Sequence, residues 1–182
     1  MKLRPTQLLS SAVVGAVTIA FAAQVALPIG AVPITLQTLA LFVVAMLGGA
    51  RIGLLAALLY LLAAWLGVPV LSGWRSLQPD GILGAKTAGF VVGFVPAAWW
   101  LARVAGPALR RPTLLHTLLH RTLMALAAHA VVLAVGGAWL AFYIGVGAAW
   151  QHGVQPFLLP AVAKSALAAL FVSLARGAKR VG

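Results

Sequence analysis

The sequence predicts an all-α integral membrane protein, a bundle of six transmembrane helices with both termini in the cytoplasm. Three observations lead to this prediction. The 182 residues are 63% hydrophobic and 8% charged, whereas soluble domains are roughly 45–50% apolar. Apolar runs recur along the chain, and a membrane-spanning helix needs about 17–25 such residues. The basic residues lie between these runs, mostly on alternate connections, as the positive-inside rule requires.

Glycine, proline and arginine interrupt the apolar sequence and define six expected spans. These spans are residues 8–26, 34–49, 52–68, 87–103, 122–143 and 160–176. The second is short, and the fifth lies in an apolar region that continues to Trp150. No linker, low-complexity tract or internal repeat divides the chain. We therefore expect a single transmembrane domain over residues 1–182.

The basic residues also predict which side each connection occupies. With six spans, ten of the thirteen lysines and arginines share one side with both termini, which we assign to the cytoplasm. These ten are Lys2, Arg4, Arg51, Arg103, Arg110, Arg111, Arg121, Arg176, Lys179 and Arg180. The longest polar connections, residues 28–35, 67–86 and 143–160, fall on the other side. Because long ordered loops are often functional, we expect a site open to the outside.

Composition excludes several other functions. The net charge of +12 would suggest nucleic acid in a soluble protein, but here the basic residues flank apolar runs instead of forming a stripe. There is no cysteine, hence no thiolate metal site and no cysteine nucleophile. Asp80 is the only acidic side chain, too few for an intramembrane enzyme that needs paired carboxylates or a metal cluster. We expect no enzymatic activity, no cofactor and no bound metal.

Three local patterns invite a chemical interpretation that their context does not support. Residues 81–87 end in Lys-Thr like a phosphate-binding loop, but Asp80 and Ala85 stand where glycines are needed. His116 and His120 are four apart, as metal ligands can be, but they lie in a basic connection without a further ligand. His129 is alone in the fifth span, and we interpret it as a packed, hydrogen-bonded core residue.

Lys164 is the charged residue that most needs an explanation. It stands about one turn inside the sixth span, which begins near Pro160. A charge within a spanning helix costs roughly 3 kcal/mol on insertion scales and usually faces the bundle interior. Lys164 is therefore a candidate anion-binding group. The alternative is that its ammonium extends to the interface without a function.

Two further groups of residues are candidates for contacts. Gln37 and Thr38 stand at the head of the second span, after a proline-rich bend, and the Gln37 amide offers both a donor and an acceptor. Gln37 could bind an amide-like ligand or bond a neighbouring helix. In the first span, Ala12, Ala16 and Ala20 are four apart, which lets another helix approach closely. That helix belongs either to a partner subunit or to this chain.

The stretch Pro-Ile-Thr-Leu-Gln-Thr-Leu, residues 33–39, closely resembles a signature of the BioY family, the biotin-specific substrate-binding components of energy-coupling-factor (ECF) transporters. Three later stretches resemble the same family in the right order. They are Tyr60 with Gly-Val-Pro-Val at 67–70, Thr-Ala-Gly-Phe-Val-Val-Gly-Phe at 87–94, and Gln-Pro-Phe through Lys164 at 155–164.

The resemblance implies a substrate-binding membrane domain in a bacterial cytoplasmic membrane, surrounded by lipid and taking up biotin from outside. It implies partners as well, a transmembrane coupling subunit and two ATPase subunits. Lys164, Gln37 and Thr38 would then make orienting contacts to the ligand. The small-residue face of Ala12, Ala16 and Ala20 is where we expect the coupling subunit.

The chain also departs from the family pattern. Ala161 stands where the family has an aspartate three residues before the lysine, and Lys86 replaces a proline and adds a second cation at the outer mouth. We hypothesise that Asp80 in the outer loop supplies the missing acceptor and that Trp74 forms an apolar lid. Two alternatives remain: capture of a different small anionic solute, or a structural membrane subunit that binds no ligand.

Overall fold

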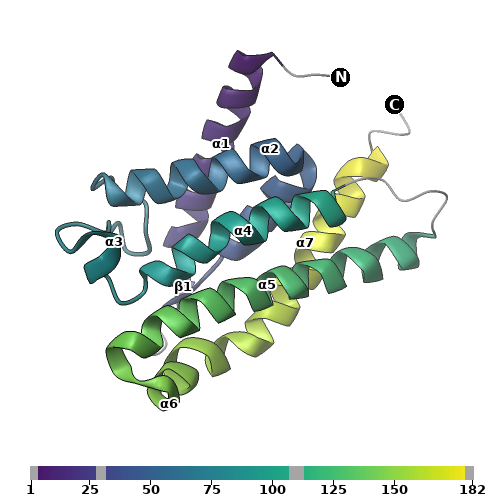
Figure 1. Ribbon diagram of the computed structural model, residues 1–182. Coiled ribbons are helices and arrows are strands. Elements are labelled where there is room, and N and C mark those ends of the chain that lie inside the picture. The colour runs from purple at the N-terminus through teal and green to yellow at the C-terminus, as the bar shows by residue number, and fades with distance from the viewer. Residues whose placement is uncertain (1–3, 28–31, 107–112, 179–182) are drawn as a thin grey trace.

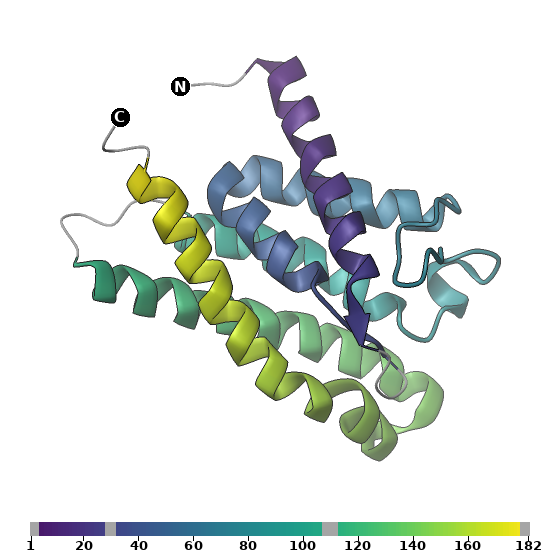
Figure 2. The same cartoon turned by 180° about the vertical axis from the view of Figure 1, so that it is seen from behind.

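The computed structural model describes residues 4–27, 32–106 and 113–178. Most of them are helical, and the long helices pack side by side (Figure 1; Figure 2). The elements in chain order are α1 (Pro5–Gln24), β1 (Ala26–Leu27), β2 (Ile34–Thr35), α2 (Gln37–Trp65), α3 (Gly81–Gly84), α4 (Ala88–Val104), α5 (Leu114–Ile144), α6 (Val146–Ala149), a π-helical turn (Trp150–Val154), a 3-10 turn (Gln155–Phe157) and α7 (Leu158–Ala178).

The second and third expected spans are joined in α2, which is interrupted at Gly49. This residue has φ 80° and ψ 176°, a backbone conformation that residues with a Cβ rarely adopt. The chain therefore reverses direction between residues 37–48 and 50–65 without a separate loop. With the two arms of α2 counted separately, the described part of the chain has the six predicted spans, of which the first arm of α2 is the shortest.

Two predicted boundaries were wrong. The fifth span begins at Leu114 instead of residue 122, because the hydroxyl of Thr113 accepts the His116 N–H at 3.2 Å and caps the helix. His116, His120 and Arg121, which were taken for part of a connection or its flank, therefore stand on the helix itself. The expected loop 143–160 is also mostly helical, since α6, the π-helical turn and the 3-10 turn fill it.

The start of α1 and the end of α7 lie at one end of the bundle, and α3 and α6 lie at the other (Figure 1; Figure 2). Of the basic residues assigned to the cytoplasm, Lys2, Arg110, Arg111, Lys179 and Arg180 are outside the described residues. The shared end agrees with an even number of spans. That this end faces the cytoplasm stays a prediction.

Arginine side chains connect the helices at the end that holds the termini. Arg176 of α7 donates to the carbonyl oxygens of Met46, at 2.6 Å, and of Gly106. Met46 lies in the last turn before the interruption at Gly49, where carbonyl groups lack their usual helical partners. Arg121, which is buried on α5, donates to the hydroxyl of Ser173 on α7 at 2.8 Å. These contacts hold α7 against α2, α4 and α5.

The small-residue face of α1 lies against α2. Ala12 is fully buried, and a Cβ on neighbouring Gly15 would meet Val44 and Ala56 of α2. Ala16 and Ala20 are partly buried against the same core. The intramolecular contact thus occupies this face, and a partner contact through it stays a prediction.

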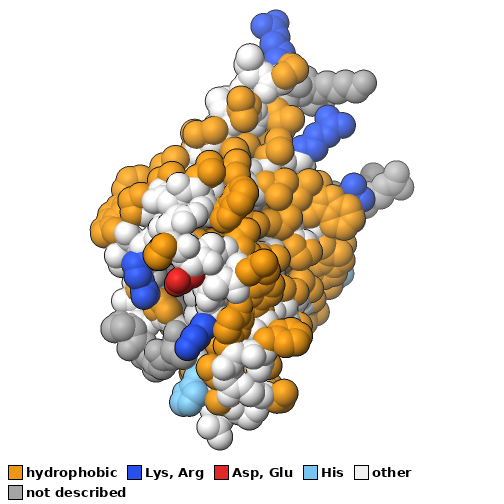
Figure 3. Space-filling view, turned by 60° about the vertical axis from the view of Figure 1, so that its left-hand side comes forward, with side chains coloured by type: hydrophobic (Ala, Val, Ile, Leu, Met, Phe, Trp, Pro, Cys, Tyr) orange, Lys and Arg blue, Asp and Glu red, His pale blue; other side chains and the backbone are white. Residues whose placement is uncertain are grey.

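Large apolar side chains cover the outside of the bundle, as expected of a surface in contact with lipid acyl chains. Figure 3 shows them spread over most of one face. Exposed examples are Val14 on α1, Phe142 on α5 and Leu159 on α7. The polar side chains described next lie inside.

Candidate ligand-binding site

A small inner pocket of about 50 Å³ lies between the head of α2, the middle of α5 and the first turns of α7. Its polar lining consists of Thr35, Gln37, Thr38, His129 and Lys164. Its apolar lining consists of Val32, Pro33, Phe90, Phe94, Val132, Leu133 and Phe157. None of these residues carries a carboxylate. The pocket has room for a polar group of a few atoms but not for a ring system.

The position of Gln37 is fixed by a two-stranded ladder and by Tyr60. Strands β1 and β2 pair antiparallel, with Ala26 opposite Thr35, and this pairing sets the start of α2. The Thr35 hydroxyl donates to Gln37 Oε1 at 2.9 Å, and Gln37 Nε2 donates to the hydroxyl of Tyr60. Tyr60 in turn donates to the Val70 carbonyl at 3.0 Å. Both ends of the Gln37 amide therefore have protein partners.

Lys164 points into the bundle and does not extend to the interface. It is 7% exposed, and its Nζ donates to the backbone carbonyl of Thr35 at 3.1 Å. That bond uses one of the three ammonium donors. The only acidic side chain of the chain, Asp80, lines a different pocket. Lys164 thus brings a positive charge with remaining donor capacity to the inner pocket.

His129 on α5 connects two other helices. Its Nδ1 lies 3.0 Å from the hydroxyl of Ser165 on α7, and its Nε2 lies 3.0 Å from the hydroxyl of Thr38 on α2. The ring is 4% exposed and packs edge-on against Phe42, with centroids 4.6 Å apart. The imidazole is therefore held in one orientation at the wall of the inner pocket.

A larger outer pocket of about 660 Å³ continues from the inner one, and both pockets share the residues Val32, Pro33, Gln37, Phe90 and Phe94. Stacked aromatic pairs border this junction. Phe94 lies against Tyr60 with centroids 6.2 Å apart, and Phe90 lies against Phe157 at 6.1 Å. The junction is thus an apolar passage between two polar regions.

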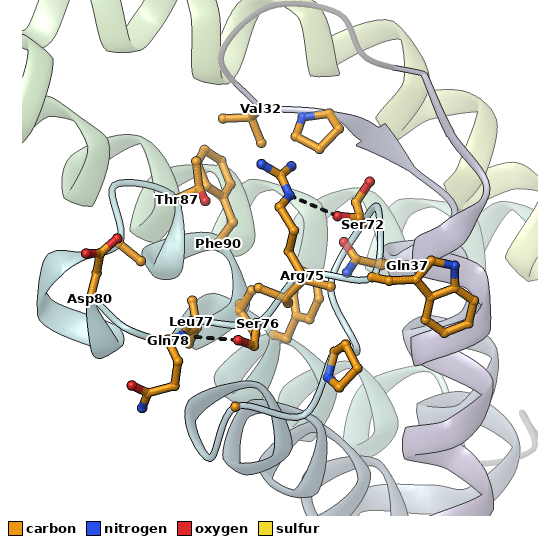
Figure 4. Close-up of a pocket in the computed structure, with 18 residues that line it drawn as sticks. Val32, Gln37, Ser72, Arg75, Ser76, Leu77, Gln78, Asp80, Thr87 and Phe90 are labelled. Atoms are coloured by element: carbon orange, nitrogen blue, oxygen red, sulfur yellow. Dashed lines mark hydrogen bonds between the residues drawn. The ribbon is translucent and has the colours of Figure 1, made fainter.

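The segment after α2 forms much of the outer pocket's wall (Figure 4). Arg75 reaches across the pocket with its guanidinium toward Val32, and its Nε donates to the Ser72 carbonyl at 3.1 Å. In the same view Asp80 lies at the α3 edge of the pocket, apart from Arg75. The outer pocket therefore presents a guanidinium group near its junction with the inner one.

The segment 71–75 is fastened to α1. Leu71 donates to the Arg75 carbonyl at 2.8 Å, which closes a short turn. At the end of α1, Gln24 donates to the Leu71 carbonyl at 3.1 Å and accepts the Trp74 N–H at 3.1 Å. The Trp74 ring also packs edge-on against Phe21, with centroids 6.3 Å apart. We call this fastened segment, residues 71–75, the outer turn.

The structure brings some of the predicted site residues together and separates others. Lys164, Gln37 and Thr38 line the inner pocket, and Asp80 and Trp74 line the outer one. Trp74 is 59% exposed and packs its ring against Phe21 of α1, and its role as a lid stays a prediction. Lys86 is exposed, and neither pocket has it in its lining. The residues Ala12, Ala16 and Ala20 also line neither pocket.

Sequence reasoning missed three residues of this site. His129 is the packed, hydrogen-bonded core residue that was expected, but it also lines the inner pocket. An ionisable residue inside a span was the signal that could have identified it. Arg75 and Ser165 carried no such signal, because an arginine in an outer loop is common and a serine bonds readily within its own helix.

Comparison with known proteins adds a family and a fold. A family model described as the BioY family matches residues 1–180. A protein of Lactococcus lactis subsp. cremoris (strain MG1363) named "Biotin transporter BioY2" is 34% identical over 163 residues, covering 86% of this chain and 83% of that protein. A "Probable biotin transporter BioY" of Pyrococcus horikoshii is 32% identical over 155 residues, covering 85% and 87%.

Among solved structures, the S-component for biotin from an ECF-type ABC transporter matches with a TM-score of 0.77. The match covers 97% of this chain and 95% of that chain at 19% identity. At this identity the likeness shows that the two chains share the fold.

Proposed function

The chain belongs to the BioY family, and on that basis we propose that it captures biotin outside the cell as the substrate-binding component of an ECF-type transporter. The observation that carries this proposal is the pair of connected pockets, with a buried ammonium at the inner end and a guanidinium at the outer end. The relatives with assigned names are transporters, and we infer transport without enzymatic activity.

The shapes of the pockets favour one orientation of biotin. The molecule has a fused bicyclic ring with a ureido group at one end and a flexible chain with a carboxylate at the other. The inner pocket admits a group of ureido size, and the outer pocket has room for the ring system and the chain. A buried carboxylate costs several kcal/mol even when paired. The carboxylate therefore stays in the outer pocket, where Arg75 can donate to it.

In this orientation the ureido carbonyl oxygen points toward Lys164. The ammonium has donors left after its bond to the Thr35 carbonyl, and a charged donor forms a stronger hydrogen bond than a neutral one. Gln37 positions the neighbouring backbone and borders both pockets. The aromatic pairs at the junction enclose the apolar part of the ring, as in most small-molecule sites.

The outer residues have smaller roles in this proposal. Trp74 moves from its contact with α1 to cover the ring, Asp80 accepts from the ligand when the outer loop closes, and Lys86 attracts the anion toward the mouth. All three side chains are exposed, so each interaction is weakened by water and salt.

The proposal includes the surroundings of the protein. The chain is a multi-pass membrane protein, and we place it in a bacterial cytoplasmic membrane with both termini inside, because the basic residues gather at that end. A transmembrane coupling subunit and two ATPase subunits complete the transporter. We place the coupling contact on α1, on or beside the face that carries Ala16 and Ala20.

One observation favours a second candidate. Position 161, where an acceptor for ureido N–H groups would be expected from the family pattern, holds a buried alanine. A small anionic solute without a ureido group would suit the inner pocket if its anion bound Lys164 directly.

Isothermal titration of biotin into the detergent-purified protein tests the proposal, with desthiobiotin and thiamine as competitors. We expect saturable binding of biotin, competition by desthiobiotin and none by thiamine. Lys164→Met should weaken biotin binding by roughly tenfold or more, since it removes a charged hydrogen bond inside the bundle. If a folded wild type does not bind biotin, the assignment is wrong and the second candidate gains support.

A further inference from the structure

The inner pocket contains an uncharged polar pair that the proposed contacts do not use, His129 with Thr38. Each comes from a different helix, α5 and α2, and each is at least nine-tenths buried. Both residues line the inner pocket. Ser165, the other neighbour of the imidazole, is fully buried and does not line the pocket. Thr38 is thus the hydroxyl of this group that a ligand can reach.

Hydrogen-bond capacity separates Thr38 from the other polar groups of the inner pocket. The Thr35 hydroxyl donates to the Gln37 oxygen and accepts the Gln37 backbone N–H, and the Gln37 nitrogen donates to Tyr60. Lys164 has no acceptor at all. The Thr38 hydroxyl is close to His129 Nε2, at 3.0 Å. When Nε2 is unprotonated it accepts a hydrogen bond from the Thr38 hydroxyl. The Thr38 oxygen then has both lone pairs available to the pocket.

The neighbouring serine is compatible with this tautomer. His129 Nδ1 lies 3.0 Å from the Ser165 oxygen, so a proton on Nδ1 has an acceptor waiting for it. A neutral imidazole carries one N–H and one acceptor nitrogen, and the partner of one nitrogen determines the state of the other. With Nδ1 donating to Ser165, Nε2 is left to accept from Thr38.

We propose that His129 is a positioning residue that holds the Thr38 hydroxyl as the acceptor for a ureido N–H of the ligand. This inference rests on the proposed function and names the group that reads the uncharged end of biotin. The chemical class recognised is a cyclic urea, whose oxygen meets Lys164 while its N–H meets Thr38. An acid is then unnecessary in the inner pocket, because a hydroxyl oriented by an imidazole supplies the acceptor without a second buried charge.

The test combines variants of the protein with variants of the ligand. Biotin and its two mono-N-methyl derivatives, each lacking one ureido N–H, are titrated into wild type, Thr38→Val and His129→Leu. For one of the two derivatives we expect wild type to bind roughly tenfold or more weakly than biotin, as the loss of a hydrogen bond in a dry pocket predicts. In both variants the affinity for biotin should fall by a similar factor. N-methylation of the ligand should then lower the affinity further by roughly threefold or less.

Conservative variants separate positioning from general packing. Thr38→Ser keeps the hydroxyl and should retain biotin affinity within roughly threefold of wild type, whereas Thr38→Val keeps the shape and loses it. His129→Gln, which can still accept from Thr38, should bind more tightly than His129→Leu. If His129→Leu does not fold, the comparison of Thr38→Ser with Thr38→Val tests the inference, since Val and Thr have the same shape.

The outcomes distinguish this inference from the proposed function. If wild type binds biotin and the penalties of methylation and of Thr38→Val simply add, the two groups do not touch and the inference is overturned. Equal biotin affinity in Thr38→Val and Thr38→Ser overturns it as well. A folded wild type that binds no biotin overturns the proposed function itself.

Discussion

The backbone N–H of Trp74 donates to the side-chain oxygen of Gln24 across 3.1 Å, and the nitrogen of the same side chain donates to the Leu71 carbonyl at 3.1 Å. One amide at the end of α1 therefore holds both sides of the outer turn. Because the outer turn lines the outer pocket, its attachment to α1 should control how long a ligand stays.

Gln24→Ala should release the outer turn and raise the dissociation rate of biotin several-fold, while the association rate changes little. Each hydrogen bond lost contributes about 0.5–1.5 kcal/mol. Stopped-flow tryptophan fluorescence measures both rates. Gln24→Glu, which keeps the acceptor for Trp74 and loses the donor, should be intermediate. A dissociation rate equal to that of wild type in Gln24→Ala would show that the outer turn does not hold the ligand.

Arg75→Ala should weaken biotin binding by roughly five- to tenfold, because the guanidinium donates to the ligand carboxylate. The loss is limited because Arg75 is exposed and partly screened by solvent. Biotinamide, which has no charge at that end, serves as the control in the same titration. Its affinity should be similar in wild type and Arg75→Ala. An equal loss for both ligands would place the carboxylate elsewhere.

Asp80→Asn tests whether the outer loop closes over the ligand. If the carboxylate accepts from bound biotin, the affinity should fall by roughly tenfold. The measurement is titration calorimetry at low and high salt, since an exposed ionic contact weakens as salt rises. In the present conformation Asp80 lies at the α3 edge of the pocket, so an unchanged affinity would exclude it from the site.

Gly136→Ala should destabilise the protein by about 1–3 kcal/mol through overpacking. A Cβ at this position would overlap the ring of Phe90, which lines both pockets. We therefore also expect weaker biotin binding. Thermal unfolding in detergent measures the stability. Gly147→Ala is the matched control, because a Cβ there meets nothing within 4 Å; equal effects of the two substitutions would contradict the packing argument.

Ala16→Leu and Ala20→Leu should reduce co-purification of the coupling and ATPase subunits while biotin binding persists. Both alanines are only partly buried against α2, so a larger side chain projects from the face where we place the partner. Val14→Leu, at a 65% exposed position of α1, is the control and should leave the complex intact. If only Val14→Leu disrupts the complex, the partner binds the lipid-facing side of α1.

The sequence was sufficient for those features that follow from local pattern and solvation. Apolar runs predicted the six spans. The cost of an isolated charge in lipid made the bundle interior one of two alternatives for Lys164, and its 7% exposure agrees with that one. The two arms of α2 are joined directly because Gly49 adopts a positive φ. The sequence Gly48-Gly49 is compatible with either a tight turn or a longer loop, so the direct join was not predicted.

What the sequence could not provide depends on contacts between distant segments. His129 meets Thr38 and Ser165 across 91 and 36 residues of chain, and a single histidine in an apolar run does not indicate which helices it will touch. Arg121 looked like part of a basic connection, yet it is 5% exposed and bonds Ser173. Such residues are explained by tertiary packing, which overrides their local signal.

The contact of Arg176 with Met46 and Gly106 has a consequence for how the protein is made. The Met46 carbonyl beside the interruption at Gly49 and the Gly106 carbonyl after α4 are synthesised before the guanidinium that binds them, which belongs to α7. These groups therefore lack this partner until α7 has been inserted. Closure of the bundle therefore follows the insertion of α7, and the inner pocket, whose Lys164 also comes from α7, exists only after it.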